Sequence, residues 1–168
     1  MRSVEGAQAE FVRSVGPRLI GSLSLYCGDR DLAEDLAQEA LARTIEHWDR
    51  VCAMAAPEAW TYRTAFNLAR SSFRHRAVER RNRGRLAVVD PLPDATDAIA
   101  VRAAVRLLPE RQRAVIVARF YLDLDVAQTA RMLRCREGTV KAHTFKAVAN
   151  LRAAGLVEKE ETVDDAPR

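Results

Sequence analysis

The segment from Asp125 to Arg152 constrains the fold more than any other stretch, because it is typical of two helices separated by only three residues. Asp125 can cap the first helix while Gln128 returns a hydrogen bond, which is the reciprocal pattern of a capping box. The inward side of this helix is expected to hold Val126, Ala127, Ala130 and Leu133. The turn at residues 134–136 and a second helix from Glu137 complete a predicted helix-turn-helix.

The second helix of this motif has two chemically different sides. Its inner side is apolar at helical spacing and holds Val140, Thr144, Ala147, Val148 and Leu151. The outer side is available to a partner and holds Lys141, Ala142, His143, Phe145, Lys146 and Arg152. Such an outer face suits the major groove of duplex DNA. An ordinary helical hairpin with a solvated basic face fits the motif equally well, so both interpretations stay open here.

The remaining sequence predicts an all-α fold of two small domains. Apolar residues recur with a period near 3.6, and only 7 Gly and 6 Pro interrupt the 168 residues. Residues 86–98 contain two prolines and three aspartates without any period, which predicts a flexible linker. The expected domains are therefore 1–85 and 99–157, and residues 158–168 form an acidic tail that we expect to be disordered.

Several function classes are disfavoured by what the sequence lacks. Cys27, Cys52 and Cys135 form no C-x-x-C pair and have no histidine at ligand spacing, so no metal and no cofactor is expected. Neither a carboxylate pair, an activated nucleophile nor a phosphate-binding glycine loop is visible, which argues against an enzyme. The sequence has no apolar run of about 20 residues and no signal peptide, so we expect a cytoplasmic protein without a membrane partner.

The charge favours a polyanionic partner. The formal net charge is +4, and the most basic segment is 100–157, which contains the helix-turn-helix. The excess is mostly arginine, which binds phosphates and base edges through two parallel hydrogen bonds. Six further arginines lie within residues 74–85 and face a single acid, Glu79. Phosphate contact explains this run better than a solvated helix end, because unscreened arginines repel one another.

A long helix predicted from about Glu58 to Arg83 carries two stripes. The apolar stripe holds Tyr62, Ala65, Phe66, Ala69 and Phe73, and the second holds Trp60, Arg63, Asn67, Arg70 and Arg74. An aromatic plane, guanidinium groups and an amide are together what binding of single-stranded nucleic acid requires. Trp60 could equally belong to the core, the more common position for a single tryptophan. Asn67 and the arginines are harder to explain in that way.

An acidic surface is predicted on the preceding helix, which we expect to run from Asp29 or Asp31 to about Trp48. Its buried side should hold Leu32, Leu36, Ala40, Ile45 and Trp48, and its opposite side holds Glu34, Asp35, Gln38, Glu39, Arg43 and Glu46. The acidic side is either solvated or a docking patch for a basic protein. Residues 49–58 break the periodicity and are predicted to form a loop.

Three sequence blocks together resemble bacterial sigma factors of the extracytoplasmic-function (ECF) group, in particular the actinobacterial SigE-like branch. The blocks are DRDLAEDLAQEALART, PEAWTYRTAFNLARSSFRHR and LPERQRAVIVARFYLDLDVAQTARMLRCREGTVKAH, in that order. The resemblance implies sigma region 2 and sigma region 4 domains in a non-enzymatic subunit of RNA polymerase. Its expected partners are core RNA polymerase and promoter DNA, both duplex and melted strand, and an anti-sigma factor is a further candidate.

The resemblance also assigns roles to residues. Minus-10 contacts would come from Trp60, Arg63, Asn67, Arg70 and Arg74, with a base pocket in the loop at residues 50–56. Minus-35 contacts would come from Arg136, Thr139, Lys141, His143 and Lys146. Polymerase docking would use Asp35, Gln38, Glu39 and Arg43, and the aspartates of the linker could mimic a transcript. Many relatives have Gly in the turn and Ser at the second cap, where this chain has Arg134 and Arg136, so promoter sequence is not transferable.

Two other interpretations are compatible with the sequence. A stand-alone helix-turn-helix regulator would bind duplex DNA as a dimer without polymerase. An adaptor would dock on a protein through the acidic helix and never touch DNA. A separate hypothesis concerns regulation: the acidic tail at 158–168 could fold back on the basic recognition surface and weaken DNA binding until polymerase displaces it.

Overall fold

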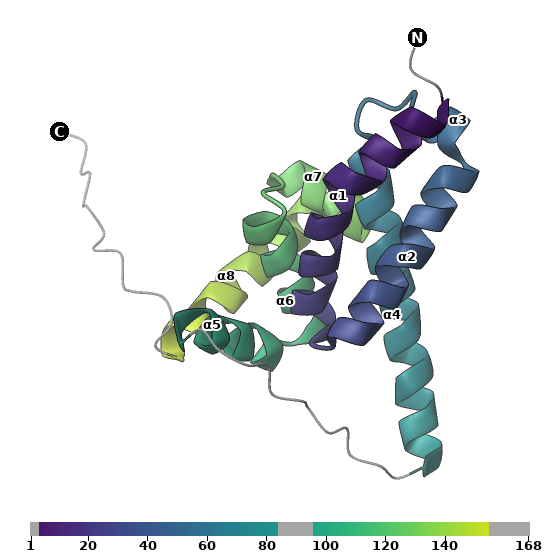
Figure 1. Cartoon of the computed structure of the whole chain (residues 1–168). Helices are drawn as coiled ribbons and strands as arrows, with labels where there is room; N and C mark the ends of the chain where they lie inside the picture. The colour runs from purple at the N-terminus through teal and green to yellow at the C-terminus, as the bar shows by residue number, and fades with distance from the viewer. Residues whose placement is uncertain (1–3, 84–95, 155–168) are drawn as a thin grey trace, which may run out of the picture.

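The computed structural model describes the backbone of residues 4–83 and 96–154, and the side chains of residues 4–76 and 99–154. Within these ranges the chain is helical and contains no strand, which confirms the all-α prediction. The elements are α1 (Val4–Cys27), α2 (Arg30–Glu46), α3 (Trp48–Val51), α4 (Pro57–Arg83), α5 (Thr96–Leu107), α6 (Glu110–Ile116), the π-helix η1 (Val117–Tyr121), α7 (Val126–Leu133) and α8 (Glu137–Ala153) (Figure 1).

Several predictions concern residues outside these ranges. They are the acidic tail at 158–168, the linker apart from its last three residues, which begin α5, and the side chains of the arginine run beyond Arg76. The loop expected at residues 49–58 differs in part from the structure. Its first residues belong to a single helical turn, α3, which packs against α2, and α4 begins at Pro57.

The first half of the molecule is built from α1, α2 and α4. Gly28 ends α1 with φ of +73°, a conformation that glycine adopts without strain. Asp29 then caps α2 by accepting a hydrogen bond from the Leu32 amide at 3.0 Å. On α4 the predicted apolar stripe is inside, with Phe66 stacked on Tyr26 of α1 at a centroid distance of 4.8 Å. These contacts fix the orientation of α4 and therefore the direction of its other stripe.

The buried side of α2 differs from the prediction. Its fully buried residues are the small ones, Ala33, Ala37, Ala40 and Thr44, whereas Leu32, Leu36, Ile45 and Trp48 are only partly buried. The physical reason is that α2 packs against both α1 and α4, and small side chains allow the helix axes to approach closely. The larger residues surround this contact. The acidic side of the helix is nevertheless exposed as expected.

The helix-turn-helix prediction is confirmed by α7 and α8. Asp125 accepts from the Gln128 amide at 2.7 Å, and the Gln128 side chain accepts from the Asp125 amide at 2.8 Å, so the capping box is complete. Arg134 occupies the left-handed region, with φ of +53°, at the end of α7. Val140 and Ala147 of α8 are fully buried. The helix before this motif, α6, continues directly into the π-helix η1. The side chain of Tyr121, at the end of η1, lies against Gly21 of α1.

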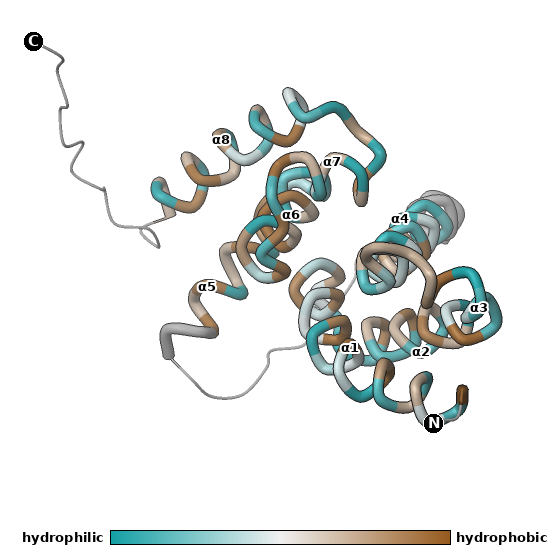
Figure 2. Tube along the Cα trace, turned by 90° about the horizontal axis from the view of Figure 1, so that it is seen from above, coloured by the Kyte–Doolittle hydropathy of each residue, from teal (hydrophilic) through white to brown (hydrophobic). Residues whose placement is uncertain are grey.

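The two halves pack against each other, with α7 beside α4 (Figure 2). One continuous core joins Leu19, Leu23 and Phe66 of the first half to Val117 and Met132 of the second. Helix α1 contacts α5, α6 and η1, and α4 contacts α7. The Tyr26 hydroxyl donates to Glu110 Oε1 at 3.1 Å, and Arg18 Nη2 donates to the Tyr121 carbonyl at 3.2 Å. The structure thus places the helix-turn-helix on the first half, an arrangement that the sequence alone did not indicate.

Candidate nucleic-acid interface

The polar stripe on α4 lies beside the buried face of that helix and flanks it. Trp60, Arg63, Asn67 and Arg70 are half-buried, and Arg74 is exposed. Trp60 lies outside the buried core: its side chain is partly exposed, and its ring lies beside His47 at a centroid distance of 5.9 Å. The helical spacing of three and four residues therefore brings these five side chains onto one accessible strip, as the sequence indicated.

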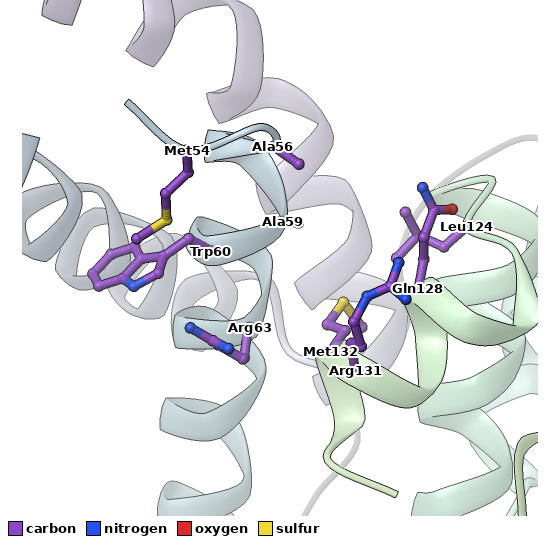
Figure 3. Close-up of a pocket in the computed structure, with 9 residues that line it drawn as sticks. All are labelled: Met54, Ala56, Ala59, Trp60, Arg63, Leu124, Gln128, Arg131 and Met132. Carbon is purple, nitrogen blue, oxygen red and sulfur yellow. The ribbon is translucent and has the colours of Figure 1, made fainter. Parts of the chain in front are cut away.

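This strip faces α7 across a cavity of about 240 Å³. Figure 3 shows that Met54, Trp60 and Arg63 line it from the first half, while Gln128 and Met132 belong to the second. None of its lining residues is acidic, although Arg63 and Arg131 approach from opposite sides. The α4 stripe is thus accessible only in part, because the first helix of the helix-turn-helix stands in front of it.

Sequence reasoning missed the residues of α7 that form this contact. Thr129 is fully buried and Met132 is 3% exposed, although neither belongs to the predicted inward stripe. The reason is that α7 packs on α8 with one side and on α4 with another. The spacing of three residues between Thr129 and Met132 was the available signal, since it places both on a second helix face.

The outer face of α8 is free along its length. Lys141, Ala142, Lys146 and Arg136 are exposed, and Phe145 is 78% exposed. Thr139 and His143 are partly buried and lie instead at a cavity shared with Tyr26 and Arg70 of the first half. The candidate residues of this helix are thus divided: three basic side chains face outward and two polar ones face the junction between the halves.

Helix α2 lies on the other side of α1 from α8 (Figure 1) and packs against α1 and α4. Asp35, Gln38, Glu39 and Arg43 are all exposed. Arg43 Nε donates to Glu39 Oε1 at 2.7 Å, four residues away on the same helix. Exposed pairs of this kind contribute about 0.3–0.5 kcal/mol, so they cost little to rearrange when a basic partner arrives.

Two groups at the junction, the buried Tyr26 and the partly buried Cys27, have shifted pKa values. Burial raises the pKa of Tyr26 well above its usual value, and the nearby Glu110 carboxylate raises it further, so Tyr26 stays a neutral donor. Burial also raises the pKa of Cys27 to about 12, opposed by Arg113 and reinforced by Asp29. A thiol with that pKa is protonated at neutral pH and is a poor nucleophile.

Two kinds of feature are absent from the described residues. They contain no group of three or more histidine, cysteine or acidic side chains that could hold a metal ion. Among the same residues, no helix combines the length and the apolar character that crossing a bilayer would require.

Comparison with known proteins agrees with this arrangement. Residues 11–79 match the family Sigma-70 region 2, and residues 98–151 match Sigma-70, region 4. The RNA polymerase sigma-E factor of Streptomyces coelicolor is 32% identical over 147 residues, covering 85% of this chain and 82% of that protein. The ECF RNA polymerase sigma factor SigL of Mycobacterium tuberculosis is 33% identical over 133 residues, covering 74% of this chain and 75% of the relative.

A solved structure shares the fold. The sigma factor RpoE, crystallised in complex with the anti-sigma factor NepR from Bartonella quintana, superimposes with a TM-score of 0.81 and covers 90% of this chain and 98% of its own. Their sequence identity is 20%, so this likeness concerns the fold alone. The two sequence families and the full-length relatives carry the assignment: the chain belongs to the extracytoplasmic-function group of RNA polymerase sigma factors.

Proposed function

We propose that this sigma factor directs core RNA polymerase to promoters with two chemically distinct surfaces. The outer face of α8 binds duplex DNA at the minus-35 element, and the α4 stripe binds the melted minus-10 strand. The observation that carries this proposal is the presence of both surfaces on one chain: an exposed basic helix face, and a strip of Trp60, Asn67 and arginines. The protein has no catalytic role of its own and acts in the cytoplasm.

The α8 surface is suited to duplex DNA. Arg136, Lys141 and Lys146 are exposed charges that can approach phosphates or guanine edges. Phe145 offers an exposed apolar surface to a thymine methyl group. Thr139 and His143 are the less accessible members of the candidate minus-35 set, because they face the junction between the halves.

The α4 stripe is suited to a single strand. The Trp60 plane can stack on an unpaired base, Asn67 can read a base edge, and Arg63, Arg70 and Arg74 can pair with the backbone. Stacking of this type is worth about 1–3 kcal/mol per base and offsets part of the cost of flipping a base out of the duplex. Because α7 stands before this stripe, the strand can occupy it fully only after the halves part.

Polymerase docking is proposed for the acidic face of α2. Asp35, Gln38 and Glu39 project from the side of α2 that packs on neither α1 nor α4, and a basic surface would complement them. This face does not overlap the contact between the halves, so docking is compatible with either arrangement. An anti-sigma factor is a further candidate partner.

Run-off transcription with core polymerase and genomic fragments tests the proposal directly. We expect promoter-dependent transcripts above those of core enzyme alone. Transcripts absent across all fragments would contradict it. Tight sequence-specific binding of duplex DNA by the isolated chain would instead favour a stand-alone regulator. Activity unaffected by replacing both Lys141 and Lys146 with Ala would favour an adaptor that does not touch DNA.

A further inference from the structure

A second cavity lies at the junction of the two halves, and its polar lining is mainly cationic. Its volume is about 140 Å³, room for roughly four or five water molecules at about 30 Å³ each. Arg70 enters from α4, Arg111 from α6 and Arg134 from the turn between α7 and α8. The only carboxylate among the residues that line it is Glu110, which already accepts the Tyr26 hydrogen bond. Arginines from three different elements therefore line one small space that holds a single carboxylate.

One buried nitrogen in this lining has no hydrogen bond: His143 Nδ1 is without a partner among the described residues. Thr139 lies in the first turn of α8, where its amide donates to the Arg136 carbonyl at 2.9 Å, and the Arg136 side chain makes no capping bond. The start of a helix carries partial positive charge, which attracts anions. The start of α8 therefore adds to the positive potential of the cavity.

Two further observations indicate that arginines from both halves act on this cavity. Burial raises the pKa of the Cys135 thiol, and Arg70 and Arg111 oppose that rise, so charges from both halves reach this one side chain. Arg134 holds its place with φ of +53°, where glycine would cost less. An arginine kept in an unfavourable backbone conformation suggests a use for its guanidinium group.

We propose that this cavity binds a small phosphate-bearing anion, such as inorganic phosphate or the terminal phosphate of a metabolite. Arg70, Arg111 and Arg134 hold the anion, and His143 Nδ1 donates to it. The geometry suits such a ligand because guanidinium groups bind phosphate oxygens in pairs. Binding needs residues of both halves, so the anion stabilises their packed arrangement. A bound anion should therefore hinder binding of a DNA strand to the α4 stripe. This consequence rests on the role proposed above for Arg70.

Thermal unfolding and isothermal titration of the full chain with sodium phosphate test the proposal, with ionic strength matched by sodium chloride. We expect a saturable rise of melting temperature with phosphate beyond that with chloride. Arg111→Gln should weaken phosphate binding at least tenfold, whereas Arg102→Gln, an equal loss of charge on the exposed surface of α5, should not. Equal weakening by both variants, or no saturable phosphate effect, would overturn the proposal.

Arg134→Gly separates anion binding from a merely structural role. Glycine relieves the left-handed conformation, so this variant should melt higher than the wild type in chloride yet bind phosphate at least tenfold more weakly. An unchanged phosphate affinity would contradict the assignment. Binding of a labelled single-stranded oligonucleotide is the last measurement. If the oligonucleotide binds the full chain saturably where phosphate does not, the small-anion site is wrong. If phosphate binds and the oligonucleotide does not bind even to the polymerase holoenzyme, the role proposed for α4 fails while the anion site stands.

Discussion

The two candidate DNA surfaces of this sigma factor differ in accessibility although both are helix faces. The outer face of α8 exposes Lys141, Lys146 and Arg152, whereas four of the five residues of the α4 stripe are half-buried. The helix that supports the first surface, α7, is the one that obstructs the second. Duplex binding through α8 is thus compatible with the packed arrangement, and strand binding through α4 requires a change in it.

The largest expected effect comes from a test of strand binding by the α4 stripe. Trp60→Ala should lower run-off transcription by about 5- to 150-fold, corresponding to about 1–3 kcal/mol of lost base stacking. Binding of duplex DNA through α8 should not change. His47→Ala is the matched control, because it removes the ring beside Trp60 and leaves the stacking plane in place. A similar loss in both variants would mean that Trp60 has a structural role.

Removing the exposed lysines of α8 tests whether this helix binds duplex DNA. Lys141→Ala and Lys146→Ala should each weaken binding of promoter duplex and reduce the slope of log affinity against log salt by about one. Fluorescence anisotropy of the polymerase holoenzyme across a salt series measures this slope. Arg13→Ala, an exposed charge on α1, is the control and should leave the slope unchanged. A slope unaffected by both lysine variants would remove α8 from the duplex interface.

Gly21 offers a way to part the halves without touching either DNA surface. A Cβ at this position would collide with the ring of Tyr121, so Gly21→Ala should weaken the packing of α1 on η1 by about 1–3 kcal/mol. The radius of gyration from small-angle scattering should rise, and the α4 stripe should bind a single strand more readily.

Two further variants complete this test. Gly138→Ala meets nothing within 4 Å and should only gain helix propensity, about 1 kcal/mol. In a Tyr121→Ala background, Gly21→Ala should lose its effect because the ring is gone. An unchanged scattering profile for Gly21→Ala alone would show that Tyr121 turns aside and that this contact does not hold the halves together.

The smallest expected effect concerns Cys27 at the junction. Its pKa is raised to about 12, above the usual 8.5 or so of a free thiol. The stabilisation from keeping this thiol neutral is fully present below the unfolded pKa and is lost as pH rises toward the folded one. We therefore expect unfolding free energy to fall between about pH 8.5 and 12, and Cys27→Ala to reduce that decline.

Thiol labelling provides the companion measurement for Cys27. Maleimide should modify exposed Cys52 much faster than Cys27 at pH 7.5 in the packed protein. Gly21→Ala should narrow this difference if it parts the halves. Equal rates in the wild type would contradict the burial of Cys27.

The sequence determined the local chemistry of the protein. Capping residues and apolar spacing were sufficient to predict the helix-turn-helix, the start of α4 and the separation of α4 into an apolar and a polar stripe. These features depend on residues within a few turns of one another, so periodicity reports them directly. The roles given to the site residues, and the domain boundaries, remain predictions.

Only the tertiary structure decided which surfaces meet. The buried alanines of α2, the second buried face of α7 at Thr129 and Met132, and the bond from Tyr26 to Glu110 all depend on partners far away in the chain. The spacing of Thr129 and Met132 places both on a second face of α7, but spacing alone does not identify the helix that covers this face. For the same reason the arginines from three elements around the small cavity were invisible until packing brought them together.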